Sequence, residues 1–267
     1  HPDEVQFILI DYKGGGLAGA FENQTTGIKL PHLVGVITNL DKNEINRSLS
    51  SIESELKRRQ ELFNKAKAEL NESTLDIYKY QQLYRNGLIK EPVSHLFIIS
   101  DEFAELKSQQ SEFMNELIST ARIGRSLGVH LILATQKPSG VVNDQIWSNS
   151  KFRICLRVQD KSDSMDMIKC ADAAELKTTG RFYLQVGYNE LFAQGQAAWA
   201  GAQYYPTEKR KKKVDQSITI VDNTGNTIKS LDNKQNEVQI ASQGEEITSI
   251  IKYIVDEAKE ENILGIL

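Results

Sequence analysis

Long apolar runs and cysteines are what this 267-residue chain has least of. No apolar stretch approaches the roughly 20 residues that a membrane-spanning helix needs, and the N-terminus lacks the charged-then-apolar pattern of a secretory signal. Only two cysteines occur, Cys155 and Cys170, and neither has His or Cys neighbours at metal-ligand spacing. This pattern excludes the common zinc motifs and indicates core or surface thiols in a reducing compartment.

An excess of positive charge is also absent. The net charge is -4 and the pI is near 5.7, which argues against a large phosphate-binding surface, although a local basic stripe stays possible. The chain begins His1-Pro2 without an initiator Met, so we expect a segment of a longer protein. With 40% hydrophobic and 25% charged residues, it can bury the core of one large or two small domains.

A Gly-Lys pair is missing as well. Residues 5–10 are typical of a buried strand that ends at Asp11, and Gly14-Gly15-Gly16 then breaks regular structure. A phosphate-binding loop could follow such a strand, but that loop needs Gly-Lys-Ser/Thr, which the chain does not contain. The glycine triplet therefore predicts a tight turn or a mobile loop.

The most informative feature present is an apolar run, residues 95–100, that stops at two adjacent carboxylates, Asp101 and Glu102. Ligands of open α/β sheets bind beyond the carboxyl ends of parallel strands. In a nucleoside triphosphatase the first carboxylate would hold Mg²⁺ through water, and the second would orient and deprotonate the attacking water. Alternatively, both carboxylates cap the following helix, and the pattern alone leaves the two interpretations open.

Apolar periodicity predicts an α/β fold. Strands are expected at residues 5–10, 95–102, 129–134, 152–158, 181–186 and 189–194, and helices at 41–70, 75–84, 110–126, 144–150 and 162–169. Strands separated by helices indicate a largely parallel sheet, and the last two strands indicate a terminal hairpin. Arg59 interrupts the apolar stripe of the long helix, which argues against a coiled coil. Tyr78, Tyr80 and Tyr84 are expected to pack and to present hydroxyls at a surface.

Composition shifts after about residue 206. Lys209-Arg210-Lys211-Lys212-Lys213 predicts a solvated linker, with a nucleic-acid-binding arm as the alternative. Residues 217–221 and 227–231 predict a hairpin, and 233–246 a polar loop. Residues 247–258 predict an amphipathic helix whose apolar face needs a partner, which we expect in a following domain.

Several motifs, in one order, resemble a known family. The run from Thr120 to Pro138, TARIGRSLGVHLILATQKP, preceded by residues 98–103, is similar to the FtsK/SpoIIIE class of hexameric RecA-like motor ATPases. Residues 11–16, 37–41, 139–142, 145–150 and 179–187 resemble, more closely, the first ATPase domain of the EssC/EccC coupling proteins of type VII secretion.

The resemblance implies site residues. Asp101 matches the Walker B aspartate for Mg²⁺, and Glu102 matches the catalytic glutamate. Gln136 matches the sensor of the γ-phosphate, although a capping role is the alternative from the residue itself. Arg125 matches the arginine that reaches a neighbouring subunit's nucleotide, with Arg122 as its competitor, and either could instead form a structural ion pair.

The resemblance also implies an architecture and a function. We expect a RecA-like P-loop NTPase core at residues 1–206 and, at residues 207–267, a linker with a hairpin and a helix that leads to a second ATPase domain. ATP and Mg²⁺ are the implied cofactors, and a ring is the implied assembly. Implied partners are small helical-hairpin secreted proteins and other membrane components of the secretion system. The implied location is the cytoplasmic face of the cell membrane, through an anchor outside this chain.

One departure and two rival functions follow from the same residues. The family's phosphate loop lies upstream of residue 5, so we expect this chain alone neither to bind ATP tightly nor to hydrolyse it. The first rival is a double-stranded DNA translocase, which the acidic composition disfavours. The second is a degenerate RecA-like domain that acts as a scaffold or a regulatory brake without hydrolysis, which the intact Asp101, Glu102 and Gln136 disfavour.

Overall fold

The computed structural model describes residues 1–11, 16–23, 27–38, 42–136, 138, 142, 144–188, 190–204, 218–222, 224, 227–231 and 245–261. Contacts divide the chain into two compact units, one comprising His1–Trp199 with Ile251–Leu267 and the other Ala200–Ile250. Gly14 and Gly15, the basic block at 209–213 and the polar segment 233–244 lie outside the described residues. The domain boundary expected between residues 206 and 207 stays a prediction.

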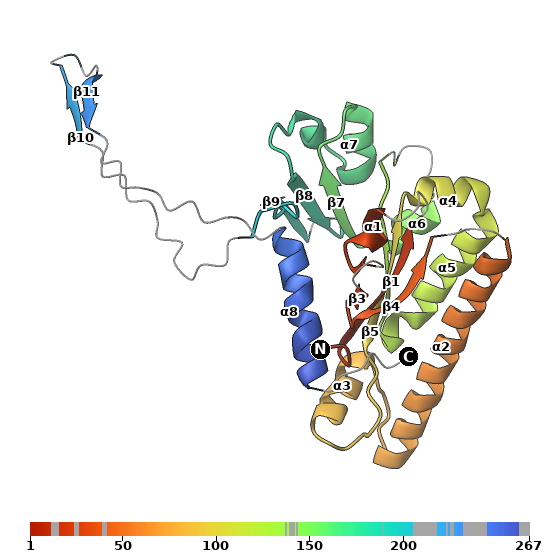
Figure 1. The fold of residues 1–267 in the computed structure, drawn as a ribbon. Helices are drawn as coiled ribbons and strands as arrows, with labels where there is room; N and C mark the ends of the chain where they lie inside the picture. Colours follow the sequence, from red (N-terminus) through yellow and green to blue (C-terminus); the bar gives the residue numbers. More distant parts are fainter. Residues whose placement is uncertain are drawn as a thin grey trace. The chain divides into compact units, whose positions relative to one another are not determined.

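A four-stranded parallel sheet forms the centre of the first unit (Figure 1). Its strands are β1 (Val5–Asp11), β4 (Leu33–Ile37), β5 (His95–Asp101) and β6 (Val129–Leu133), in the order β4-β1-β5-β6. Every neighbouring pair is parallel, and helical segments lie between the successive strands. The predicted α/β fold with a mostly parallel sheet is therefore confirmed.

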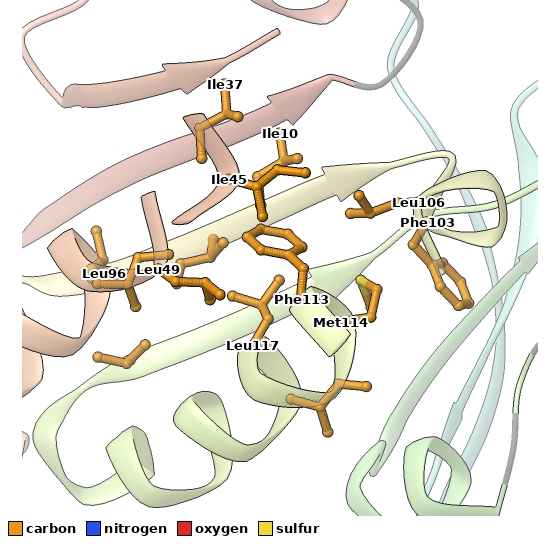
Figure 2. Close-up of a cluster of buried hydrophobic side chains, with 14 of the residues drawn as sticks. Ile10, Ile37, Ile45, Leu49, Leu96, Phe103, Leu106, Phe113, Met114 and Leu117 are labelled. Atoms are coloured by element: carbon orange, nitrogen blue, oxygen red, sulfur yellow. The ribbon is translucent and has the colours of Figure 1, made fainter. Parts of the chain in front are cut away.

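Two helices cover one face of this sheet, α2 (Lys42–Leu70) and α5 (Ser111–Gly124). Figure 2 shows apolar side chains from the two helices and from the strands meeting in a single cluster. Along β5, burial alternates: Leu96, Ile98 and Ser100 are fully buried, whereas the residues between them are partly exposed. One face of β5 is therefore covered more completely than the other within the described part of the chain.

The end of α2 packs on α3 (Ile77–Arg85), where the Phe63 and Tyr80 rings stack at 4.6 Å. Asp76 caps α3 by accepting the Lys79 N–H, so the helix starts two residues later than residue 75, where the sequence places it. Gly87 follows with a φ of +74°, as expected of the glycine that ends a helix. Tyr80 is buried, with its hydroxyl donating to the Glu91 carbonyl, and of the three tyrosines Tyr78 is the one most exposed, at 68%.

The structure contains several elements that were not expected from the sequence, among them the sheet strand β4, and it differs from the prediction in three further places. An additional helix, α4 (Phe103–Gln109), separates β5 from α5. β7 (Phe152–Leu156) does not join the parallel sheet but pairs antiparallel with β8 (Arg181–Val186), which pairs with β9 (Leu191–Gln196). The predicted β8-β9 hairpin is thus confirmed, whereas the parallel placement of β7 is wrong. The remaining elements of the first 199 residues are α1 (Gly16–Gly19), β2 (Glu22–Asn23), β3 (Ile28–Lys29), η1 (Arg125–Leu127), α6 (Asp144–Asn149), α7 (Lys161–Ile168) and η2 (Asp172–Glu175).

The third difference concerns α8 (Glu246–Glu260). Its side chains Ile251, Val255 and Ala258 are buried and belong to the first unit, so this part of the apolar face finds its partner within the chain itself rather than in a following domain. In the second unit, β10 (Ile218–Val221) and β11 (Thr227–Leu231) form the predicted hairpin. Among the described helices, none combines the length and apolar character needed to cross a bilayer.

Candidate active site

The acidic residues at the ends of β1 and β5 lie side by side. Asp11 and Asp101 are register partners at the carboxyl edge of the parallel sheet, where α/β proteins bind ligands. Asp11 is 2% exposed and its Oδ2 accepts the N–H of Leu17 at 3.0 Å, which fixes the start of α1. Asp11 is not among the site residues expected from the sequence. The sequence did contain a signal for it, because the strand at residues 5–10 also ends in an acidic residue.

Glu102 leaves the strand in a left-handed backbone conformation, with φ 49° and ψ 45°. This conformation costs a residue with a Cβ roughly 1–2 kcal/mol, and such strain concentrates at functional sites. Glu102 occupies the N-cap position of α4 but makes no side-chain cap hydrogen bond, so the capping alternative does not hold for this carboxylate. The side chain is 6% exposed.

The Glu102 carboxylate instead faces the segment that follows β6. Its Oε1 accepts a hydrogen bond from the Thr135 hydroxyl at 3.2 Å and a longer one from the Gln136 N–H at 3.4 Å. Thr135 is a second residue that the sequence analysis did not assign to the site. These donors orient the carboxylate toward the carboxyl edge of the sheet.

Backbone hydrogen bonds hold this arrangement on both sides of the acidic pair. The Ala134 N–H donates to the Ser100 carbonyl at 2.9 Å, and the Phe103 N–H donates to the Ala134 carbonyl at 2.9 Å. The end of β6 is therefore tied to the residues before and after the acidic pair. The backbone N–H of Gln136 thus lies next to Glu102, while the Gln136 side chain is exposed.

The oxygen donors of this edge suit Mg²⁺. Asp101 Oδ1 accepts the N–H of Glu102 at 3.0 Å, and within the described ranges no hydrogen bond to Asp101 Oδ2 is found. Mg²⁺ is commonly held by one or two carboxylates together with water and substrate phosphates, rather than by an all-protein cage. The described residues contain no group of three or more His, Cys, Asp or Glu side chains that could hold a metal by themselves. Asp101 therefore fits a metal held partly through water.

Arg122 and Arg125 lie at the opposite end of the strands, next to the amino end of β6. Arg122 is in the last turn of α5 and Arg125 begins η1, immediately before β6. Because β5 and β6 are parallel and β6 has five residues, these arginines are separated from the acidic edge by the length of the strand, about 16 Å. Both side chains are exposed, and neither forms an ion pair with any described residue. The structure therefore does not join them to Glu102 within one chain.

Two glycines fix the backbone around Arg125. A Cβ at Gly124 would lie 2.8 Å from side-chain atoms of Leu56 and Val129, so a larger residue would push α5 away from its neighbours. Gly128 has a φ of +80°, and a Cβ there would lie 2.6 Å from Ile77 Cγ1. The turn that carries Arg125 is consequently set by close packing on both sides.

Comparisons with known proteins give a matching family and several similar proteins. Residues 1–140 match the FtsK/SpoIIIE family. The chain is 54% identical over 225 residues to the type VII secretion system protein EssC of Staphylococcus aureus (strain NCTC 8325 / PS 47), an alignment that covers 84% of this chain and 14% of that protein. It is 48% identical to the ESX secretion system protein YukB of Bacillus subtilis (strain 168), covering 96% of this chain and 16% of that protein.

A solved structure is similar as well. The cytoplasmic domain of the Thermomonospora curvata type VII secretion ATPase EccC has a TM-score of 0.62 and 28% sequence identity, over 79% of this chain and 23% of that one. The chain therefore spans less than a quarter of the length of any of these three relatives.

Proposed function

The chain belongs to the FtsK/SpoIIIE family, and from this premise we propose that it is part of an ATP-hydrolysing motor of a type VII secretion system, which drives export of protein substrates across the membrane. The observation that carries the proposal is the buried, strained Glu102 beside Asp101, bonded to Thr135 at the carboxyl edge of a parallel sheet. Identity of about half with two secretion proteins supports the same system.

Each side chain has a role in this proposal. Glu102 orients the attacking water and accepts its proton, while Thr135 holds the carboxylate in the required direction. Asp101 holds Mg²⁺ through water, and the ion, when bound, neutralises charge on the phosphate oxygens. Gln136 extends an exposed amide from the same edge, where it can sense the γ-phosphate through a hydrogen bond. Arg125 of a neighbouring subunit stabilises the charge of the transition state.

The phosphate-binding half of the site comes from outside these 267 residues in this proposal. Its support is the absence of a Gly-Lys pair, which a phosphate loop requires. The isolated chain is then inactive, and hydrolysis belongs to the longer protein. A ring of subunits follows from a site that needs an arginine in trans.

The partners are proposed from the relatives. Secreted proteins are the cargo, since EssC and YukB are named as secretion proteins. The resemblance to the EssC/EccC coupling proteins is the reason for proposing small helical-hairpin proteins as that cargo and other membrane components of the secretion system as neighbours. The motor domain works at the cytoplasmic face of the membrane, attached through an anchor elsewhere in the protein. A net charge of -4 favours protein over DNA as the cargo.

Replacing Glu102 by Gln in the full-length protein tests this function. The amide keeps the shape and burial of the side chain but cannot accept the proton, so we expect ATP turnover to fall by about 100-fold or more, with nucleotide affinity retained. Secretion of cargo should be lost in the same variant. Glu105→Gln is the matched control, because Glu105 is an exposed acid only three residues away on α4. Turnover by Glu102→Gln at the unmodified rate would reject the proposed role.

A further inference from the structure

Arg59 of α2 is the largest fully buried side chain in the described residues, with 1% exposed. Arginine is rarely buried unless its charge and its N–H groups are paired. Its Nε donates to Glu55 Oε1 at 2.8 Å, and its Nη1 donates to two backbone carbonyls, those of Ser94 at 2.6 Å and Leu127 at 2.9 Å. Arg59, which interrupts the apolar stripe of α2, therefore forms buried hydrogen bonds that connect this helix to two other segments.

The two carbonyls belong to segments that matter for the proposed site. Ser94 immediately precedes β5, the strand that ends in Asp101 and Glu102. Leu127 is the last residue of η1, the turn that begins with Arg125. One guanidinium group thus ties α2 to the entrance of the acidic strand and to the turn that carries the exposed arginine.

A lysine could not reproduce this connection. The planar guanidinium presents several N–H groups in a fixed fork, whereas an ammonium group is a single point on a flexible stem. The charge is balanced locally: burial lowers the pKa of Arg59, and the neighbouring Glu55 carboxylate raises it. Without Arg59, the Leu127 carbonyl would be left near the core without its side-chain donor, and η1 would lose its link to α2.

We propose that Arg59, held by Glu55, is a positioning residue that fixes the turn from which Arg125 reaches the nucleotide of a neighbouring subunit. Gly124 and Gly128 set the shape of this turn, and Arg59 sets its place relative to α2 and β5. The proposal rests on the proposed function, because it assigns a role to Arg125 in trans.

The first measurement is ATP turnover by the full-length, ring-forming protein carrying Arg59→Lys. We expect kcat to fall at least tenfold while KM for ATP stays within about twofold, because the turn lies at the sheet edge opposite to Asp101 and Glu102. Arg58→Lys is the matched control: Arg58 is the adjacent arginine and also bonds Glu55, but it is 40% exposed and reaches Glu91 rather than the two carbonyls. Its turnover should remain unchanged.

Mixing subunits separates positioning from simple structural damage. A Glu102→Gln subunit lacks the catalytic carboxylate but keeps Arg125. An Arg125→Ala subunit keeps the carboxylate but lacks the arginine. Mixed rings of these two should regain activity, since about one site in four of a random equimolar ring combines the two intact halves. Arg59→Lys should behave like Arg125→Ala: rescued by Glu102→Gln subunits and not by Arg125→Ala subunits.

The outcomes are distinguishable. If Arg125→Ala and Glu102→Gln fail to complement each other, the trans role of Arg125 falls, and the Arg59 proposal falls with it. If they do complement but Arg59→Lys is not rescued by Glu102→Gln, the proposed function stands and Arg59 is only a structural residue. Glu55→Gln, which removes the charge but not the guanidinium, should show a milder defect with the same pattern of rescue. If Arg59→Lys does not fold, Glu55→Gln tests the positioning role in its place: rescue by Glu102→Gln subunits supports the role, and no rescue rejects it.

Discussion

His95 and His130 form the one histidine pair that the described residues join directly, with 2.9 Å between Nδ1 and Nε2 across β5 and β6. One ring must be neutral for the other to donate, so two protonated rings cannot keep this bond. Burial, followed by the charge of Arg59, lowers the pKa of His95; burial, followed by the charges of His95 and Arg59, lowers that of His130. Glu4 opposes the shift at His95, while Tyr78 and Phe97 contribute ring contacts only.

We predict that acid destabilises the chain through this pair. Because the folded pKa values lie below the ordinary value of 6.5, the unfolded chain takes up protons first as the pH falls. The stability from the neutral pair is complete above about pH 6.5 and is lost as the pH falls from there through the lowered values. Urea unfolding between pH 7.5 and 5.0 should show this loss of stability. In His130→Gln the free energy of unfolding should depend less steeply on pH. The two slopes should differ by at most about 1.4 kcal/mol per pH unit, because one titrating group has been removed. An unchanged slope would contradict the assignment.

Among the elements, the connection from α5 through η1 to β6 depends on two glycines, Gly124 and Gly128. Gly87 and Gly128 have nearly the same left-handed φ, at +74° and +80°, but different surroundings. A Cβ at Gly87 would meet nothing within 4 Å, whereas one at Gly128 would lie 2.6 Å from Ile77 Cγ1. The two sites therefore separate backbone strain from steric overlap.

We predict that Gly87→Ala lowers the free energy of unfolding by about 1–2 kcal/mol, the cost of the left-handed backbone alone. Gly128→Ala should lower it by about 2–4 kcal/mol, because overpacking against Ile77 adds to the same strain. Urea denaturation of the two variants measures the difference. Equal losses would mean that Ile77 moves aside without cost.

The elements also show what periodicity reveals and what it cannot. The strands β1, β5 and β6 and the helix α2 follow from apolar runs and from three- and four-residue spacing, both of which are local signals. The sheet to which β7 belongs depends on pairing with residues 182–186, about 30 positions later, which alternation within the strand does not encode.

At the site, the sequence identified Asp101 and Glu102 by their place after a strand, but not their neighbours. The left-handed backbone of Glu102 has no residue-type signal, because such conformations usually fall on glycine. The carbonyl partners of Arg59 lie 35 and 68 residues away in the chain, so its burial could only be read as an interruption of a stripe.

At the scale of the whole molecule, the β7-β8-β9 sheet leaves one face open. Its other face packs on α7 and η2 through Cys155, Ile168 and Ala173. The open face carries an apolar residue at each described position of the three strands, several of them about half exposed or more. These positions are Phe152, Ile154, Leu156, Phe182, Leu184, Leu191, Ala193 and Gly195, together with Val186, which is buried at the end of β8. Contiguous exposed apolar surface of this kind promotes association.

We predict that this face makes the isolated chain bind hydrophobic dyes and self-associate. The double substitution Ile154→Thr and Leu156→Thr should reduce both effects and change the free energy of unfolding by less than about 1 kcal/mol, since threonine suits an exposed strand. Dye fluorescence and size-exclusion chromatography at several concentrations test this. Cys155→Ser, on the buried face of the same strand, is the control and should leave dye binding undiminished. If the threonine variant binds as much dye as the unmodified chain, this face is not the surface that binds the dye, and the prediction is wrong.

The opposite placement of the acidic pair and Arg125 has a consequence for symmetry. Asp101 and Glu102 lie at one edge of the parallel sheet and Arg125 at the other, so the domain has two unlike ends. A two-fold dimer can pair these unlike ends only in an antiparallel, side-by-side arrangement, which satisfies both sites at once and stops at two copies. A head-to-tail contact also presents the arginine of one copy to the carboxylates of the next, and it leaves one unlike end free on each terminal copy. Such contact repeats until a constant rotation closes it, and without closure it would grow into an open filament.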